Sequence, residues 1–203
     1  NKYYIISLLI SFNFLNSQVV ENIGSVLSVY GKCYVENKSL NRFAAPLTGT
    51  SIFNNDVIIT KEDSHCEVLL NDETVKVFID EFSSAKLYVE KFSVTVTVIS
   101  GSAFVENAKT EIKTYVSTKY NDVFINNNQV WISIIEGSDR ILPLVNTIDV
   151  YNIISKKHIQ TIPLEISDIS SDGILIKDYD LNSIPLFVKD KIDQNKAKKN
   201  IPQ

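Results

Sequence analysis

The residues of this chain that could take part in catalysis are few and widely spaced. The only two histidines, His65 and His158, are far apart in the sequence. Asp63, Ser64 and His65 carry the groups of a hydrolase triad. However, adjacent residues of an extended chain point to opposite faces, so these three cannot form a triad among themselves. Motifs of zinc proteases, α/β hydrolases, dinucleotide-binding and P-loop proteins are absent. We therefore expect no catalytic residues and a protein that is not an enzyme.

Carboxylates that could hold a metal ion are scattered rather than grouped. Each lies in a polar break between apolar runs, where aspartate is common because it forms local hydrogen bonds. No stretch has the spacing of a calcium-binding loop, and neither histidine has a ligand-spaced neighbour. We therefore expect no metal and no cofactor. The aspartates concerned are Asp56, Asp63, Asp72 and Asp80.

Aromatic side chains provide one candidate surface. The single tryptophan, Trp131, lies in QVWISII, on the strand face opposite three aliphatic residues. It belongs either to the core or to a surface that contacts a partner or stacks on a sugar, and the high average burial of tryptophan favours the core. Tyr115 and Tyr120 have the same two interpretations. Together the three residues form the candidate partner or ligand surface.

The composition is that of an ordinary globular protein. The chain has 203 residues, of which 44% are hydrophobic and 22% are charged, and the net charge is −4. This length is enough for one domain with a sizeable core, or for one domain and a small appendage. No basic cluster occurs before the C-terminus, so we expect no nucleic acid as a partner.

The N-terminal residues 1–18, NKYYIISLLISFNFLNSQ, have the pattern of a secretory signal peptide. Lys2 is followed by an apolar stretch from Ile5 to Leu15, which is too short for a membrane-spanning helix. An uncleaved anchor and a buried strand are the alternatives. We expect an exported protein, either periplasmic or extracellular or at the cell surface, with no transmembrane span once the signal is removed.

The two cysteines, Cys33 and Cys66, have two interpretations. An exported protein meets oxidising conditions, which allows a disulfide between them. They also fit two small buried side chains in neighbouring strands. Both alternatives stay open, because the sequence does not give the Cβ separation that a disulfide needs.

Short strands are the elements that would position these residues. Residues 93–99, SVTVTVI, alternate apolar and polar side chains, which indicates a half-buried strand. Turn residues recur about every ten positions, and this spacing predicts an all-β fold, a sandwich or barrel-like arrangement of short antiparallel strands. Residues 64–80, SHCEVLLNDETVKVFID, predict a hairpin with Asp72 and Glu73 in its turn. The expected strands are residues 24–30, 32–36, 57–60, 66–70, 74–79, 86–90, 93–99, 102–106, 113–117, 122–125 and 129–135.

The chain changes character after Pro143. Four of its five prolines lie in residues 143–203. We expect residues 19–142 to form the β domain and residues 143–190 a small C-terminal appendage, with short strands at 162–166 and 173–176. Residues 191–203 have mixed charge and few apolar side chains, which predicts a mobile tail.

Six segments resemble, in the same order, the patterns of the FecR-like domain of bacterial envelope proteins. These patterns are G-x-V-x-V-x-G, plxxGDxIxT, SxxExxFxDGTxLxL, LxxGxVxV, GTxF and VxVxEGxV. The matching segments are residues 24–31, 47–60 (LTGTSIFNNDVIIT), 64–77, 98–105 (VISGSAFV), 117–120 (STKY) and 130–137 (VWISIIEG).

Three positions depart from the family patterns. Asn55, Glu73 and Ser117 stand where glycine is usual. Glycine suits turns because it accepts a positive φ without a Cβ clash. In the hairpin turn we expect Asn71 or Asp72 to take that conformation instead.

The resemblance covers about residues 23–140 and implies a FecR-type β domain in the cell envelope. It further implies a role in protein–protein interaction or signal relay, with an envelope protein of unknown identity as the partner. The best-known members join this domain to a cytoplasmic anti-sigma segment and a membrane helix. This sequence shows no such segment before its apolar stretch, so we expect a stand-alone exported module. A surface domain that binds carbohydrate or another ligand is the alternative.

Overall fold

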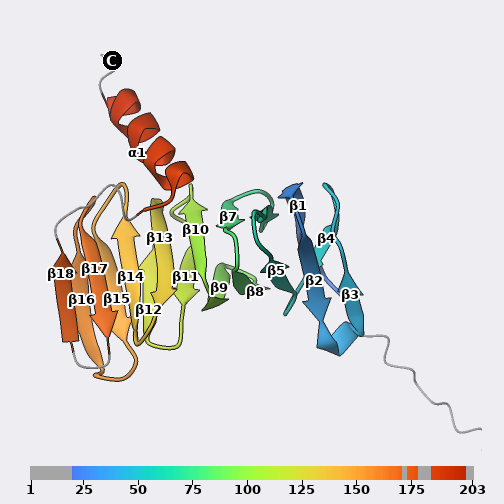
Figure 1. Ribbon diagram of the computed structural model, residues 1–203, viewed down its shortest axis with the longest axis horizontal. Helices are drawn as coiled ribbons and strands as arrows, with labels where there is room; N and C mark the ends of the chain where they lie inside the picture. Colours follow the sequence, from blue (N-terminus) through green and yellow to red (C-terminus); the bar gives the residue numbers. More distant parts are fainter. Residues whose placement is uncertain (1–19, 171–172, 178–183, 200–203) are drawn as a thin grey trace, which may run out of the picture.

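The computed structural model describes residues 20–170, 173–177 and 184–199 (Figure 1). The expected signal segment, residues 1–18, lies outside the described residues. The described chain forms two nine-stranded sheets that pack face to face, and one helix at the C-terminal end. The all-β class expected from the turn spacing is confirmed, and of the two arrangements considered the structure has the sandwich.

Along the chain, single strands or pairs of consecutive strands belong alternately to the two sheets. All pairings are antiparallel except that of β9 with β11. In spatial order the first sheet contains β18 (Gly173–Lys177), β17 (Ile166–Ser170), β14 (Ser138–Pro143), β13 (Asn128–Ile135), β10 (Ser102–Asn107), β7 (Val75–Ile79), β6 (His65–Leu70), β1 (Asn22–Tyr30) and β4 (Ser51–Phe53). The second sheet contains β16 (Lys157–Thr161), β15 (Ile148–Asn152), β12 (Asn121–Ile125), β11 (Lys113–Ser117), β9 (Ser93–Ser100), β8 (Ser84–Glu90), β5 (Val57–Thr60), β2 (Cys33–Asn37) and β3 (Arg42–Ala44).

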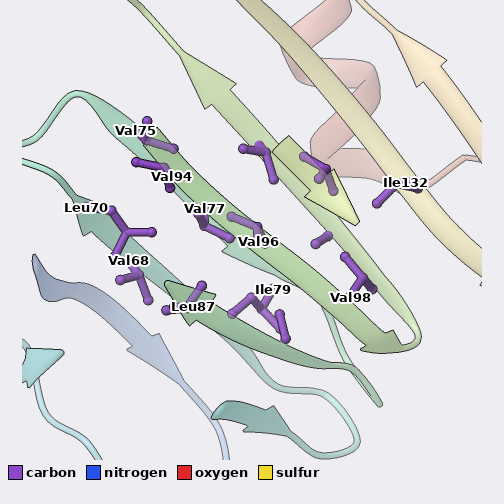
Figure 2. Close-up of a cluster of buried hydrophobic side chains, with 14 of the residues drawn as sticks. Val68, Leu70, Val75, Val77, Ile79, Leu87, Val94, Val96, Val98 and Ile132 are labelled. Atoms are coloured by element: carbon purple, nitrogen blue, oxygen red, sulfur yellow. The ribbon is translucent and has the colours of Figure 1, made fainter. Parts of the chain in front are cut away.

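The main core lies between the inward faces of the two sheets. Figure 2 shows its middle, where Val68 and Val77 of the first sheet lie near Leu87 and Val96 of the second. All four side chains are fully buried. Strand alternation puts every second residue into this layer, and the burial of each such side chain contributes about 1.5–3 kcal/mol. The alternating apolar pattern of residues 93–99 therefore becomes strand β9.

The predicted hairpin of residues 64–80 is confirmed as the pair β6 and β7. Its turn contains three consecutive residues with positive φ: Asn71 at 49°, Asp72 at 51° and Glu73 at 63°. Asn71 and Asp72 take the left-handed conformation as expected, and Glu73 takes it as well. Three residues other than glycine thus adopt the left-handed conformation that glycine would usually provide in this turn.

Two corners of the sandwich use the same pairing of a glycine with a serine. The Ser64 hydroxyl accepts a hydrogen bond from the amide of Lys32 at 2.7 Å, beside Gly31. In the second corner the Ser83 hydroxyl accepts one from the amide of Ser102 at 2.8 Å, beside Gly101. A Cβ added to Gly101 would lie 2.2 Å from Ser83 Oγ, so this close approach requires glycine.

The C-terminal region differs from the expectation. Strands β15 to β18 extend the two sheets, so residues 148–170 and 173–177 continue the sandwich instead of forming a separate appendage. The expected strand at 162–166 is wrong, because β16 ends at Thr161 and β17 begins at Ile166. The strand expected at 173–176 is confirmed as β18.

The mobile tail expected from residue 191 is also corrected, because residues 186–199 form helix α1 (Leu186–Lys199). Val188 and Ile192 of the helix are buried against Trp131 and Leu142 on the outer face of the first sheet. The Asn195 amide also donates to the Gln129 side chain at 2.7 Å. Few of the helical residues are apolar, so docking on the sheet rather than a marked sequence pattern stabilises the helix.

The described residues contain no helix with the length and apolarity needed to cross a membrane.

The glycine corners give a test of the fold. We expect Gly101→Ala to lower the free energy of unfolding by about 2–4 kcal/mol, because it adds a steric clash to the cost of a positive φ. Gly137→Ala is the matched control: Gly137 has a φ of 78°, and an added Cβ would meet nothing within 4 Å. It should cost only about 1 kcal/mol. Urea unfolding curves measure both values, and equal losses would contradict the steric account.

Candidate functional site

A groove of about 730 Å³ lies on the outer face of the second sheet, across β9, β8, β5 and β2. Val57 and Ile59 form part of its floor, because alternation points them outward while Ile58 between them is fully buried. Lys86 pairs with Val57 on the neighbouring strand. The register between β8 and β9 shifts at Ser84, and such an irregularity bends a strand locally.

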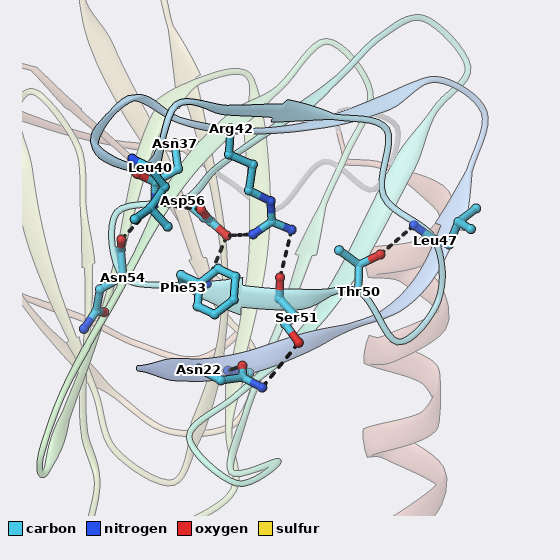
Figure 3. A network of polar contacts seen from close by, with 11 residues as sticks. Asn22, Asn37, Leu40, Arg42, Leu47, Thr50, Ser51, Phe53, Asn54 and Asp56 are labelled. Atoms are coloured by element: carbon cyan, nitrogen blue, oxygen red, sulfur yellow. Dashed lines mark hydrogen bonds and ion pairs between the residues drawn. The ribbon is translucent and has the colours of Figure 1, made fainter. Parts of the chain in front are cut away.

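One wall of the groove is held by a buried carboxylate, Asp56 (Figure 3). Its oxygens accept hydrogen bonds from the Asn37 amide at 2.8 Å, the Arg42 guanidinium at 2.9 Å and the backbone N–H of Phe53 at 2.9 Å. These donors satisfy and neutralise a charge that would be costly to bury alone. The aspartate of the NNDVIIT segment thus has a structural role.

The same network fixes the rim of the groove. The Asn37 side-chain oxygen accepts from the amide of Leu40 at 3.2 Å and caps the short 3₁₀ turn η1 (Lys38–Leu40). Lys38 and Ser39 of this turn line the groove. These hydrogen bonds at the end of β2 therefore fix the backbone of Lys38, whereas its side chain is 90% exposed.

The opposite wall is a corner between β5 and β8. The backbone N–H of Ser83 donates to the Thr60 hydroxyl at 3.0 Å, and that hydroxyl donates to the carbonyl of Asp80. This corner places Lys61 and Phe82 on the groove wall, and Phe82 is 61% exposed.

The charge of the groove is opposite in sign to that of the whole chain. Three lysines, Lys38, Lys61 and Lys86, line it together with one carboxylate, Glu36. Lys38 lies 4.0 Å from Glu36. Within the described part of the chain, neither Lys61 nor Lys86 forms an ion pair. The groove therefore combines an apolar floor with free positive charge on a chain of net charge −4.

The three aromatic residues of the candidate surface are not brought together. Trp131 is 3% exposed and lies under helix α1, so its place on a ligand-binding surface is corrected: it belongs to the core. Tyr115 lies on the outer face of the other sheet, beside Phe124 at a ring distance of 5.4 Å. Tyr120 follows β11, with the Lys119 ammonium 5.3 Å from its ring centroid.

Ser64 and His65 have structural contacts in place of a hydrolase arrangement. The Ser64 hydroxyl donates to the carbonyl of Glu62 at 2.8 Å while it accepts from Lys32. The His65 ring stacks between Tyr30 and Phe78 at centroid distances of 5.1 and 5.0 Å. The described residues contain no group of three side chains that could hold a metal ion.

Cys33 and Cys66 are free and buried, one in each sheet. The Cys33 thiol donates to the carbonyl of His65 at 3.3 Å, which brings it beside Cys66. Burial raises the pKa of Cys66 to about 12, with smaller contributions from Cys33 and Glu67. Burial also raises the pKa of Cys33. Both groups are therefore protonated, weakly reactive thiols near neutral pH.

A second buried carboxylate, Asp139 of β14, has no cationic partner among the described residues. Its Oδ2 accepts from the Thr118 hydroxyl and from the Asn121 amide at 2.7 Å, while Oδ1 has no hydrogen-bond partner among the described residues. Burial raises the pKa of this carboxyl, and the two hydrogen bonds oppose the shift only in part.

The groove was not predictable from the sequence. Its lysines stand at positions 38, 61 and 86, with no short motif between them. They meet because β2, β5 and β8 are neighbours in register, as in the pairs of Val57 with Glu36 and with Lys86. The only local signal was the run VIIT, which has apolar residues on both faces of a strand, so that some of them must face outward.

The reactivity of the cysteines can be tested directly. In the native protein we expect iodoacetamide to modify neither cysteine near neutral pH, because both thiols are buried and protonated. In denaturant without reductant, two adducts in the intact mass would show free thiols. No adduct until reductant is added would show the disulfide between Cys33 and Cys66, which stays a prediction for the exported protein. Rapid modification of the native protein would contradict the burial described above.

The pKa of Asp139 predicts a pH dependence of stability. A carboxyl whose pKa is raised on folding contributes stability below its ordinary pKa of 3.8, and this contribution is lost as the pH rises through the raised value. Asp139→Asn stays neutral at every pH. We therefore expect the variant to gain stability relative to the natural chain between about pH 4 and pH 7. Urea unfolding across this range measures the difference, and a difference that does not change with pH would contradict the expectation.

Comparisons with known proteins give a similarity of fold. No protein-family model matches the chain, and no curated protein matches it. Two crystal structures, at 1.65 and 2.50 Å resolution, are of a protein described as a "putative anti-sigma factor" from Parabacteroides distasonis ATCC 8503. Each matches with a TM-score of 0.53 and 18% identity, over 61% of this chain and 60% of that chain. The matched region thus spans less than two thirds of the solved protein.

Proposed function

We propose that this chain is an exported, non-enzymatic module of the bacterial cell envelope that binds another protein and relays a signal, as a divergent FecR-like domain. The observation that carries the proposal is the shared fold with the solved anti-sigma-like protein. A regulator acts through a protein partner, whose identity the fold similarity does not give. The six FecR-like segments, found in order in the sequence, support the same proposal.

The arrangement of side chains also fits a binding module. The serine and histidine that could suggest a hydrolase are used in a corner and in an aromatic stack. The carbohydrate-binding alternative depended on an accessible Trp131, and that residue is buried. Exposed apolar side chains, in contrast, occur on both sheets and on helix α1.

In-cell photocrosslinking tests the proposal. A photoreactive phenylalanine analogue is placed singly at four exposed sites spread over the molecule: Phe43, Ile99, Ile154 and Leu186. We expect at least one site to give a reproducible adduct with one protein of the source cells. Deletion of the chain should then change a confined set of transcripts, because a relay module acts through a regulator.

The same cells provide the test of export. The intact mass of the fractionated protein should correspond to a chain that begins near Gln18 or Val19, outside the cytoplasm.

Buried Val68 is the control position for the photoreactive analogue in the crosslinking experiment, where an adduct would indicate an unfolded population. No adduct at any of the exposed sites, together with unchanged transcripts, would contradict the proposed function.

A further inference from the structure

We propose that the lysine-lined groove on the outer face of the second sheet binds a short, extended, acidic and apolar segment of a partner protein. This inference deepens the proposed function, because it names the face of the module and the chemistry of the segment that the face takes. The groove is defined by its floor of Val57, Ile59 and Ile99 and by Lys61 and Lys86.

The size of the groove matches a peptide of a few residues. It crosses four adjacent strands, β2, β5, β8 and β9. Neighbouring strands lie about 4.8 Å apart, so the groove is about 14 Å long, the length of about four residues of an extended chain. Its volume of about 730 Å³ lies within the range of about 300–1,000 Å³ that is usual for small-ligand sites.

The floor of the groove favours apolar side chains. Ile99 is 53% exposed and Phe82 is 61% exposed, and both flank the outward-facing Val57 and Ile59 of β5. The outer face of the first sheet carries comparable residues, but helix α1 covers them there. The described chain has no element over the groove, so its apolar atoms stay in contact with solvent.

The walls of the groove select for negative charge. Lys61 follows β5 just beyond Ile59, and Lys86 lies on β8 in register with Val57. No carboxylate of the described chain pairs with either lysine. In an extended segment with alternating acidic and apolar residues, the apolar side chains would face the floor. The carboxylates would point the other way and lie at the mouth of the groove, near the ends of the long lysine side chains. Charge complementarity of this kind sets specificity and the rate of association more than the affinity.

The groove is also held in shape before any ligand binds. The Asp56 network fixes the rim at Lys38, and the bonds between Thr60 and Ser83 fix the wall at Lys61 and Phe82. A preformed site loses little conformational freedom on binding, which favours recognition of a short segment.

Nuclear magnetic resonance titration of the labelled protein tests the inference. The probe is the peptide acetyl-Glu-Leu-Glu-Leu-amide, and the comparison peptides are acetyl-Lys-Leu-Lys-Leu-amide and acetyl-Glu-Ser-Glu-Ser-amide. We expect the first peptide to cause saturable shifts of the amides of Val57, Ile59, Lys86 and Ile99. The other two should bind at least about tenfold more weakly, and added salt should weaken the binding of the first.

Charge reversal provides matched variants. Lys61→Glu with Lys86→Glu should weaken binding of the Glu-Leu peptide at least about tenfold. Lys113→Glu with Lys157→Glu makes the same change in net charge at exposed lysines away from the groove, and it should have less than a twofold effect. Unfolding midpoints close to that of the natural chain show that both variants are folded.

Three results would overturn the inference: shifts that do not saturate, shifts located on another face, or equal binding of the acidic and basic peptides. The crosslinking experiment separates this failure from that of the proposed function. Adducts at Leu186 or Ile154 without any at Ile99 would mean that the partner binds another surface of the module. The inference about the groove would then fail, while the proposed function would hold. A partner adduct at Ile99 that the Lys61→Glu, Lys86→Glu pair abolishes would support both.

Discussion

The contact between the two inward sheet faces is the interaction on which the rest of the structure depends. Each strand contributes every second side chain to this layer, and the layer is filled almost entirely by valine, isoleucine and leucine. The residues between them must then face outward, whatever their type. One outward face carries enough large apolar residues to bind helix α1, and the other is left open with its groove.

The two buried aspartates show that the same residue type can have opposite effects on this sandwich. Asp56 has a guanidinium and two N–H donors, so its burial is compensated and its network stiffens the groove. Asp139 has two donors, no cation and one oxygen without a partner in the described structure, so its charge is opposed by burial. A buried carboxylate with a cation and enough hydrogen-bond donors can therefore organise a surface. A buried carboxylate without a cation destabilises the fold when it is charged.

The local elements of this fold were predictable from the sequence, whereas the contacts between distant residues were not. The hairpin of β6 and β7 was predictable because alternation and a polar turn are properties of adjacent residues. Helix α1 was missed because its docking residues are few and their partners lie far away in the chain, as Val188 and Trp131 illustrate. The groove was missed for the same reason: Lys38, Lys61 and Lys86 converge only through the register of three strands.

The order of the strands has a consequence for how the chain can acquire its structure from its N-terminus onward. From β5 onward, each sheet adds its strands in the order in which they occur in the sequence. A chain that emerges from its N-terminus thus offers each strand from β5 onward a neighbour that has already formed, and no early edge has to wait for the last residues. Growth of this kind resembles the stepwise extension of a repeat protein, in which structure spreads from one unit to the next.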